Sequence, residues 1–163
     1  MGKAKPAERA EAKEVKRNLD IRKVLAPVDF STNAEAAVVA AGELAEKFGA
    51  ELYVMYVVEP APFISDLRNV VYTLSDKQLA LKAETELEAL AVRFVPPSVP
   101  VKRLVKIGKA HHEITRAAKK LGVDLIVVST HGYTGIKHTL MGSTAERVVR
   151  HADCPVFVVR AEK

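Results

Sequence analysis

The feature that most constrains the fold is an alternation between short apolar runs and longer segments whose apolar residues recur at helical spacing. Apolar runs occupy residues 21–28, 52–58, 99–107, 124–129 and 155–160, and helical spacing occurs in the four intervals between them. Short apolar runs are typical of buried strands, and strand–helix alternation favours a parallel sheet joined by right-handed crossovers. The sequence therefore predicts a three-layer α/β fold, an open sheet of five parallel strands with four helices.

Capping residues predict where the helices begin and end. Residue pairs with the spacing of a capping box are Thr32 with Glu35, Ser75 with Gln78, and Ser143 with Glu146. A proline-containing loop is expected through about residue 74, before the second helix. The third helix is expected over residues 110–121, and Gly49 and Gly122 are expected to end the first and third helices.

Charge and proline distinguish an edge strand from a central one. Lys102, Arg103 and Lys106 interrupt the run at 99–107, and Pro100 lies near its start. These residues suit an edge strand better than a central strand. The run at 124–129 has the continuous apolar core LIVV, which is typical of a strand covered on both faces. We expect 99–107 at the edge and 124–129 inside the sheet.

Length and composition predict one globular domain. The chain has 163 residues, and we assign residues 21–163 to the domain. Residues 1–20 are rich in Ala, Lys and Glu, with Val15 and Leu19 as large apolar side chains, so a flexible N-terminal tail is expected. No membrane-length apolar run or secretory signal pattern occurs, so a cytoplasmic protein without a membrane partner is predicted.

The formal net charge of +5 does not by itself indicate a nucleic-acid partner. Acidic and basic residues interleave along most of the chain, and no aromatic-rich basic cluster occurs, so no nucleic acid is expected to bind. His111 and His112 are adjacent, so on a helix they diverge by roughly 100° and do not form a metal-binding face. We therefore predict no metal site made by protein ligands.

In an open parallel sheet, ligands bind beyond the carboxyl ends of the strands, near the point where strand order reverses. The loops there are residues 27–32, 57–60 and 130–142. The eight glycines show neither the Walker spacing nor the dinucleotide-binding spacing. Gly132 and Gly142 nevertheless allow backbone amides to approach a phosphate, and Gly142 with Ser143 begins a helix, whose amino end favours an anion.

Each of these residues also has a plain structural interpretation. Gly132 serves equally as an ordinary turn residue, and Ser143 as a helix cap. Asp29 follows the first strand, where a carboxylate accepts hydrogen bonds from ribose hydroxyls or from a helix entry. His131 donates either to a phosphate or within its own loop. The sequence does not choose between these alternatives for Asp29 and His131; for the glycine-framed loop, the joint spacing favours phosphate binding.

Several blocks of the sequence resemble the universal stress protein family over about residues 21–160. They are VLAPVDFS, MYVVEP, GVDLIVVSTHG and STHGYTGIKHTLMGSTAERVVRHADCPVFVVR. The nucleotide-binding branch of that family has the signature Gly-x2-Gly-x9-Gly-Ser/Thr. Here the signature is Ser129-x2-Gly132-x9-Gly142-Ser143, with Ser129 in place of the first glycine.

The resemblance implies a fold like that of the adenine nucleotide alpha hydrolases, and ATP binding with Mg²⁺ or Mn²⁺ held through the phosphates. It also implies a homodimer that pairs through the last strand. Asp29 would contact the ribose and Val57 the adenine. The nucleotide-binding residues predicted on this basis are Pro27, Val28, Asp29, Val57, Ser129, His131, Gly132, Gly142, Ser143 and Thr144.

Two functions follow as hypotheses. The first is an ATP-binding regulatory module of the stress response, favoured by the two retained signature glycines. The second is a dimeric stress adaptor of the same fold that binds no nucleotide, which the serine at position 129 keeps open. Ser143 has no evident partner base and no paired carboxylates converge on the loop, so no catalytic residue is predicted and hydrolysis is at most slow.

Overall fold

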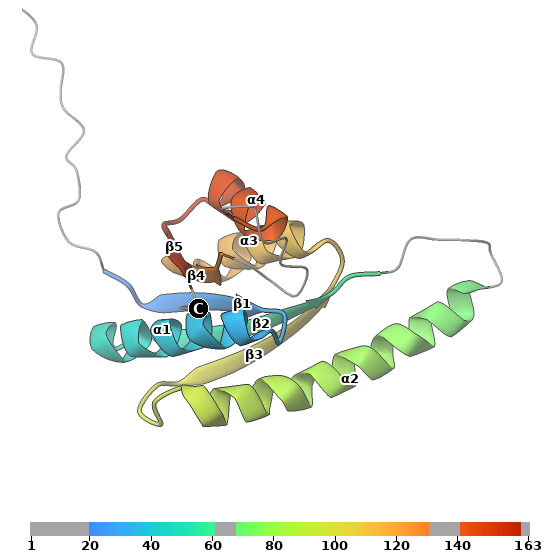
Figure 1. Cartoon of the computed structure of the whole chain (residues 1–163), viewed down its shortest axis with the longest axis horizontal. Helices are drawn as coiled ribbons and strands as arrows, with labels where there is room; N and C mark the ends of the chain where they lie inside the picture. The colour runs from blue at the N-terminus through green and yellow to red at the C-terminus, as the bar shows by residue number, and fades with distance from the viewer. Residues whose placement is uncertain (1–19, 61–67, 131–140, 161–163) are drawn as a thin grey trace, which may run out of the picture.

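The computed structural model describes residues 20–60, 68–130 and 141–160, with residues 68–77 described by their backbone alone. Within these residues five strands alternate with four helices (Figure 1). Their order is β1 (Lys23–Val28), α1 (Thr32–Phe48), β2 (Glu51–Val58), α2 (Arg68–Phe94), β3 (Val101–Ile107), α3 (Ala110–Leu121), β4 (Leu125–Ser129), α4 (Ser143–His151) and β5 (Val156–Val159). The predicted fold class is confirmed.

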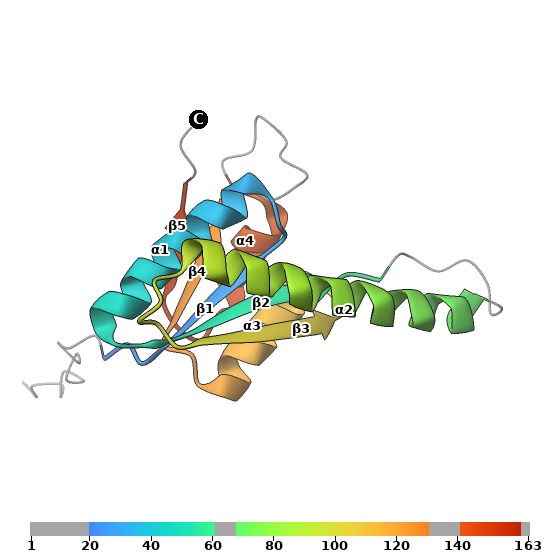
Figure 2. The same cartoon turned by 90° about the horizontal axis from the view of Figure 1, so that it is seen from below.

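All strand pairs are parallel, and the strand order is β3-β2-β1-β4-β5. Strand β3 forms one edge of the sheet and β4 lies inside it, as predicted. Helices α1 and α2 cover one face and α3 and α4 the other (Figures 1 and 2). Strands β1, β2 and β3 lie side by side in chain order, and β4 then pairs with the other side of β1. The strand order therefore reverses between β1 and β4.

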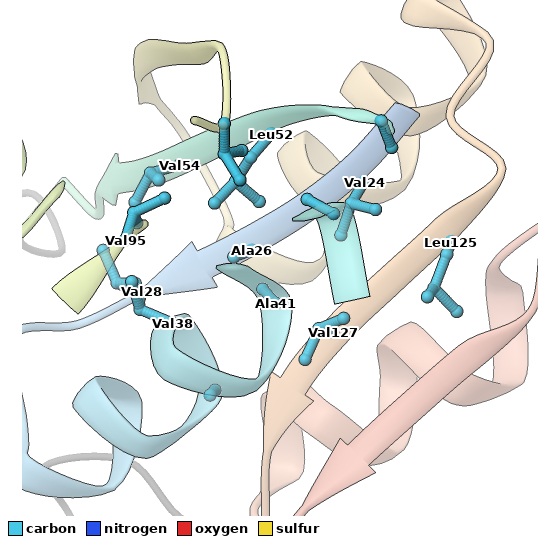
Figure 3. Close-up of a cluster of buried hydrophobic side chains, with 14 of the residues drawn as sticks. Val24, Ala26, Val28, Val38, Ala41, Leu52, Val54, Val95, Leu125 and Val127 are labelled. Atoms are coloured by element: carbon cyan, nitrogen blue, oxygen red, sulfur yellow. The ribbon is translucent and has the colours of Figure 1, made fainter. Parts of the chain in front are cut away.

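The larger core fills the space between the sheet and helices α1 and α2 (Figure 3). Val24, Ala26 and Val28 point from β1 into this core, whereas Leu25 points into the smaller core under α3 and α4. Helix α1 turns a row of buried alanines toward the sheet. Small side chains let the helix lie close to the strands. The short connection of residues 29–31 places the amino end of α1 at the carboxyl end of β1.

The helix ends agree with prediction more often than the helix starts. Helix α3 spans the predicted residues, and Gly49 and Gly122 end α1 and α3 in the left-handed conformation, with φ of 63° and 64°. Left-handed backbone favours glycine because it has no Cβ atom. The second helix begins at Arg68, so the predicted loop through residue 74 and the start at Ser75 are wrong.

Two other predicted caps are also wrong, each by one residue. The cap of α1 is Ser31, whose Oγ accepts a hydrogen bond from the Ala34 N–H at 3.2 Å, and Thr32 is the first helical residue. The cap position of α4 is Gly142 and Ser143 is its first helical residue. A cap needs extended backbone, which Ser31 has at φ −77° and ψ 158°. Serine and threonine both suit a cap position, and here the chain enters the helix at residue 31 and not at residue 32.

No helix within the described part of the chain is long and apolar enough to cross a membrane.

Candidate functional site

A pocket of about 700 Å³ opens at the carboxyl ends of β1, β2 and β4, beside the amino ends of α1, α3 and α4. It lies where the strand order reverses, because the chain leaves β1 toward one face of the sheet and leaves β4 toward the other. The strand ends therefore diverge and leave a crevice. Its size is typical of small-molecule sites, which occupy roughly 300–1,000 Å³.

Eight of the ten sequence-predicted site residues line this one pocket. They are Pro27, Val28, Asp29, Val57, Ser129, Gly142, Ser143 and Thr144. The other two, His131 and Gly132, lie outside the described residues. The structure thus brings together residues from four separate stretches of sequence, and their role in binding stays a prediction.

The amino end of α4 presents backbone N–H groups to the pocket. The first hydrogen bond of this helix runs from the Glu146 N–H to the Gly142 carbonyl oxygen at 2.9 Å, so the amides of Ser143, Thr144 and Ala145 precede the helical ladder. No side chain caps this end. Unpaired amides and the helix dipole together attract an anion.

The amide of Gly142 itself is used within the fold. Its N–H donates to the Thr130 carbonyl oxygen at 2.6 Å, which ties the start of α4 to the end of β4. A contact between backbone amides of this turn and a phosphate stays a prediction, and the amides of residues 143–145 are the ones that precede the helical ladder. With φ −66° and ψ 149°, Gly142 has backbone that other residues also adopt. The absence of a side chain, not conformational freedom, distinguishes glycine here.

Asp29 has the structural role that the sequence left open. Its Oδ1 accepts hydrogen bonds from the Ser31 N–H at 3.1 Å and from the Ser31 hydroxyl at 2.6 Å. Asp29 thereby fixes the residue that caps α1. An ionised carboxylate has about four acceptor positions, so this role is compatible with a hydrogen bond from a ribose hydroxyl. Both interpretations of Asp29 are consistent with its geometry.

An aromatic pair that no sequence pattern indicated forms another part of the pocket lining. The rings of Phe30 and Tyr56 lie 4.7 Å apart between centroids and both residues line the pocket. Phe30 has φ of 60°, an unusual conformation for a bulky residue, at the turn between β1 and α1. Burial raises the pKa of Tyr56, and the nearby carboxylates of Glu86, Asp29 and Glu59 raise it further.

Every charged side chain of the described residues that line the pocket is a carboxylate: Asp29, Glu59 and Glu86. Glu59 accepts a hydrogen bond from the Ala110 N–H at 2.6 Å and so caps α3. Glu59 lies in the loop directly after β2, and that position at the carboxyl end of a strand is the sequence feature that indicates a place at the pocket. Glu86 comes from the middle of α2, and no local pattern links that helix to the strand ends.

Comparisons with known proteins agree with this architecture. The sequence matches the model of the Universal stress protein family over residues 20–160. It is 33% identical over 142 residues to Universal stress protein MJ0531 of Methanocaldococcus jannaschii, covering 87% of this chain and 84% of the relative. The structure resembles that of Universal stress protein UspA from Lactobacillus plantarum, with a TM-score of 0.78 and 28% identity, covering 88% of this chain and 100% of the other.

Two more distant solved structures share the fold and contain a nucleotide. One is a universal stress protein in complex with cAMP, with a TM-score of 0.59 and 20% identity, covering 86% of this chain and 98% of the other. The second is the universal stress protein from Archaeoglobus fulgidus in complex with dAMP, with a TM-score of 0.53, 19% identity and the same coverage.

The fold and the pocket define a parallel three-layer α/β domain with a ligand-sized crevice at the strand-order reversal. The family match spans most of that domain. The chain belongs to the universal stress protein family.

Proposed function

We propose that this universal stress protein is a regulatory module that binds ATP, with Mg²⁺ or Mn²⁺ held mainly through the phosphates. The observation that carries the proposal is the uncapped amino end of α4, which faces a pocket of about 700 Å³ at the strand-order reversal. The amides of residues 143–145 would hold the phosphates. Val57 would contact the adenine, and Asp29 would accept from the ribose. The fold holds adenine nucleotides in the cAMP and dAMP complexes.

The charges of the pocket support a role for the metal ion. The charged side chains that line it within the described chain are all carboxylates, and they repel an uncompensated triphosphate. A divalent cation bound to the phosphates offsets that repulsion. We therefore expect ATP to bind more tightly with magnesium than without it.

A dimeric stress adaptor without bound nucleotide is the second candidate, and Ser129 favours it. This residue ends β4, is half-buried and lines the pocket where the nucleotide-binding signature has glycine. A side chain that points inward would crowd a ribose. We propose no hydrolytic role, because catalysis needs a base beside the γ-phosphate and two of the three described lining carboxylates, Asp29 and Glu59, already accept hydrogen bonds from Ser31 and Ala110.

Calorimetric titration of ATP with magnesium into nucleotide-stripped protein separates the two candidates, with Ser129→Gly titrated in parallel. The regulatory-module proposal expects heat from the unaltered protein. No binding heat from the unaltered protein, with clear binding by Ser129→Gly, would favour the adaptor and would attribute the lost binding to residue 129. No binding heat from either the unaltered protein or Ser129→Gly would reject the proposal that this protein binds ATP. Native mass spectrometry of the freshly purified protein, searching for co-purified nucleotide, gives an independent check.

A further inference from the structure

We propose that the outer edge of β3 binds an extended, acidic peptide segment of a partner protein, which adds a strand to the sheet. Peptides often bind by such strand addition, in which main-chain hydrogen bonds supply affinity and alternate side chains supply specificity. Three features of β3 carry the proposal: an open backbone edge, an adjoining apolar groove and an excess of positive charge. This surface lies apart from the residues that line the nucleotide pocket.

Strand β3 pairs with β2 alone, so one side of its backbone is open (Figure 2). The Leu52 N–H donates to the Pro100 carbonyl oxygen at 2.9 Å, which turns the backbone groups of even-numbered residues toward β2. In a parallel ladder, alternate residues direct their N–H and C=O groups to opposite sides of the strand. The backbone groups that face the open edge therefore belong to Val101, Arg103 and Val105.

A groove of about 420 Å³ adjoins this edge on the α2 side of the sheet. Most of its lining is apolar and comes from the end of α2, the following loop and β3, including Val92, Val95, Val99 and Val101. Val92 is 81% exposed. A strand added beside β3 would send every second side chain into this groove, where apolar side chains would lose contact with water.

The opposite face of β3 is basic. Val101 and Val105 pack with the core under α1 and α2, whereas Leu104 packs with the core under α3. Lys102, Leu104 and Lys106 are alternate residues of β3, so their side chains point to the same face of the sheet, the face covered by α3. Lys106 is exposed and forms no ion pair with any described residue. Lys102 Nζ already contacts Glu51 Oε1 at 2.6 Å, so acidic side chains on the second face of an added strand would meet chiefly Lys106.

Positive charge is concentrated along this part of the chain. Strand β3 contains three basic residues, Lys102, Arg103 and Lys106, and no acidic residue. Lys102 contacts the Glu51 carboxylate and Arg103 contacts the Glu88 carboxylate, and both of these carboxylates come from neighbouring elements. Lysines on an edge strand discourage pairing with a second copy of the same edge. The same charges attract an acidic strand and select it over other partners. The expected partner segment therefore alternates apolar and acidic residues.

The experiment uses the full chain and a fluorescein-labelled octapeptide in which valine alternates with glutamate. Fluorescence anisotropy should show saturable binding that weakens as salt is added, because surface charges are screened. An octapeptide in which valine alternates with lysine should bind at least about tenfold more weakly. Lys106→Glu and Val92→Asp should each weaken binding of the acidic peptide about fivefold, through charge and through the groove respectively.

Arg160→Glu is the matched control for Lys106→Glu. It makes the same change of charge just beyond β5, at the opposite edge of the sheet, and should leave peptide affinity within about twofold. Hydrogen exchange followed by NMR tests the strand geometry directly. The acidic peptide should slow exchange at the amides of Val101, Arg103 and Val105, because these donate to the added strand.

Equal binding of the two peptides would overturn the proposal, as would unchanged exchange at those three amides. Either result would leave Lys102 and Lys106 as residues that keep the edge from pairing with another copy. Displacement of the acidic peptide by single-stranded RNA, without protection of the three amides, would also overturn it. The basic residues of β3 would then bind the phosphate backbone of a nucleic acid and not a peptide strand.

Discussion

At the scale of single residues, the pocket is built from groups that already have a structural role. Asp29 holds Ser31 in place as the cap of α1, and the Gly142 N–H holds the start of α4 against Thr130. A substitution that removes one of these bonds is therefore expected to change stability as well as any ligand binding. Measurements of stability are needed beside every measurement of affinity.

We predict that Gly142→Val removes much of the ATP binding with little loss of stability. The backbone at Gly142 is extended, which valine adopts readily, and the helix start bonds through backbone atoms. The new side chain would obstruct the approach of phosphates to the amides of residues 143–145. We expect ATP affinity to fall at least about tenfold while the free energy of unfolding falls by about 1 kcal/mol. Unchanged affinity would show that the phosphates do not bind at α4.

Asp29→Ala is the companion change, with a different expected result. It removes the proposed ribose acceptor and also the acceptor for Ser31, so affinity and stability should both decrease. Loss of a buried hydrogen-bond acceptor typically costs about 1–3 kcal/mol. Asp29→Asn keeps an acceptor for Ser31 and should recover most of the stability, measured by thermal unfolding. Retained ATP affinity in both variants would exclude a ribose contact by Asp29.

At the scale of secondary-structure elements, three histidines lie near one another where α3 meets α4. The His111 ring lies 4.4 Å from that of His112 and 6.5 Å from that of His151, between centroids. Burial lowers the pKa of His111, the nearby His112, Arg147 and His151 lower it further, and Glu59 raises it. Protonation of His111 therefore disfavours the packing of α3 on α4.

We predict that stability falls as the pH drops below about 6.5, the ordinary pKa of histidine. His111 resists protonation in the folded state, so the unfolded chain binds more protons between its lowered pKa and 6.5. Acidification then shifts the equilibrium toward unfolding. His111→Gln should flatten the dependence of Tm on pH between pH 7.5 and pH 5, as scanning calorimetry would measure. His112→Gln is the matched control. Identical slopes for the unaltered protein and His111→Gln would contradict the prediction.

At the scale of the whole molecule, β5 forms the second edge of the sheet. It pairs with β4 alone, and Phe157 in β5 and Val149 in α4 are 48% and 45% exposed. An apolar, unpaired edge is prone to associate with another chain. The family resemblance implies pairing of β5 with its copy across a two-fold axis. The contrast with the lysine-containing edge at β3 leads us to predict self-association at β5.

We predict that the protein is a homodimer and that Val158→Lys weakens it. A lysine in the middle of β5 would bring like charges together across the two-fold axis. Analytical ultracentrifugation at tens of micromolar should show a dimer for the unaltered protein and more monomer for the variant. Val92→Lys, an equal change on the exposed side of α2, should leave association unchanged. A compact monomer for the unaltered protein would reject the dimer.

Deletion of residues 1–18 should change Tm by less than about 2 °C. Val15 is the only large apolar side chain after the initial methionine that this deletion removes. Ile21 gives the contrast: it is 5% exposed and packs in the core, so Ile21→Ala should cost about 2–4 kcal/mol. A loss of several degrees on deleting residues 1–18 would show that the tail packs against the domain. Its flexibility stays a prediction, as does the cytoplasmic location.

The sequence by itself determined the features that depend on local pattern. Short, largely apolar runs predicted the five strands, and the continuous run at 124–129 predicted a central strand because a strand buried on both faces needs apolar side chains at consecutive positions. Pro100 and the lysines of 99–107 predicted an edge because a central strand would have to bury them. Gly49 and Gly122 predicted two helix ends because left-handed backbone favours glycine. The capping-box pair Ser143 and Glu146 predicted the start of the fourth helix to within one residue.

Only the tertiary structure decided the features that depend on how distant segments meet. Ser31, not Thr32, caps α1 because the chain turns into the helix at residue 31, and α2 begins at Arg68, ahead of the predicted cap at Ser75. The Gly142 amide bonds Thr130 because packing brings the start of α4 back to the end of β4. Glu86 and Tyr56 join the pocket through contacts between elements. No spacing along the chain encodes such contacts, because they arise from the order and register of the strands.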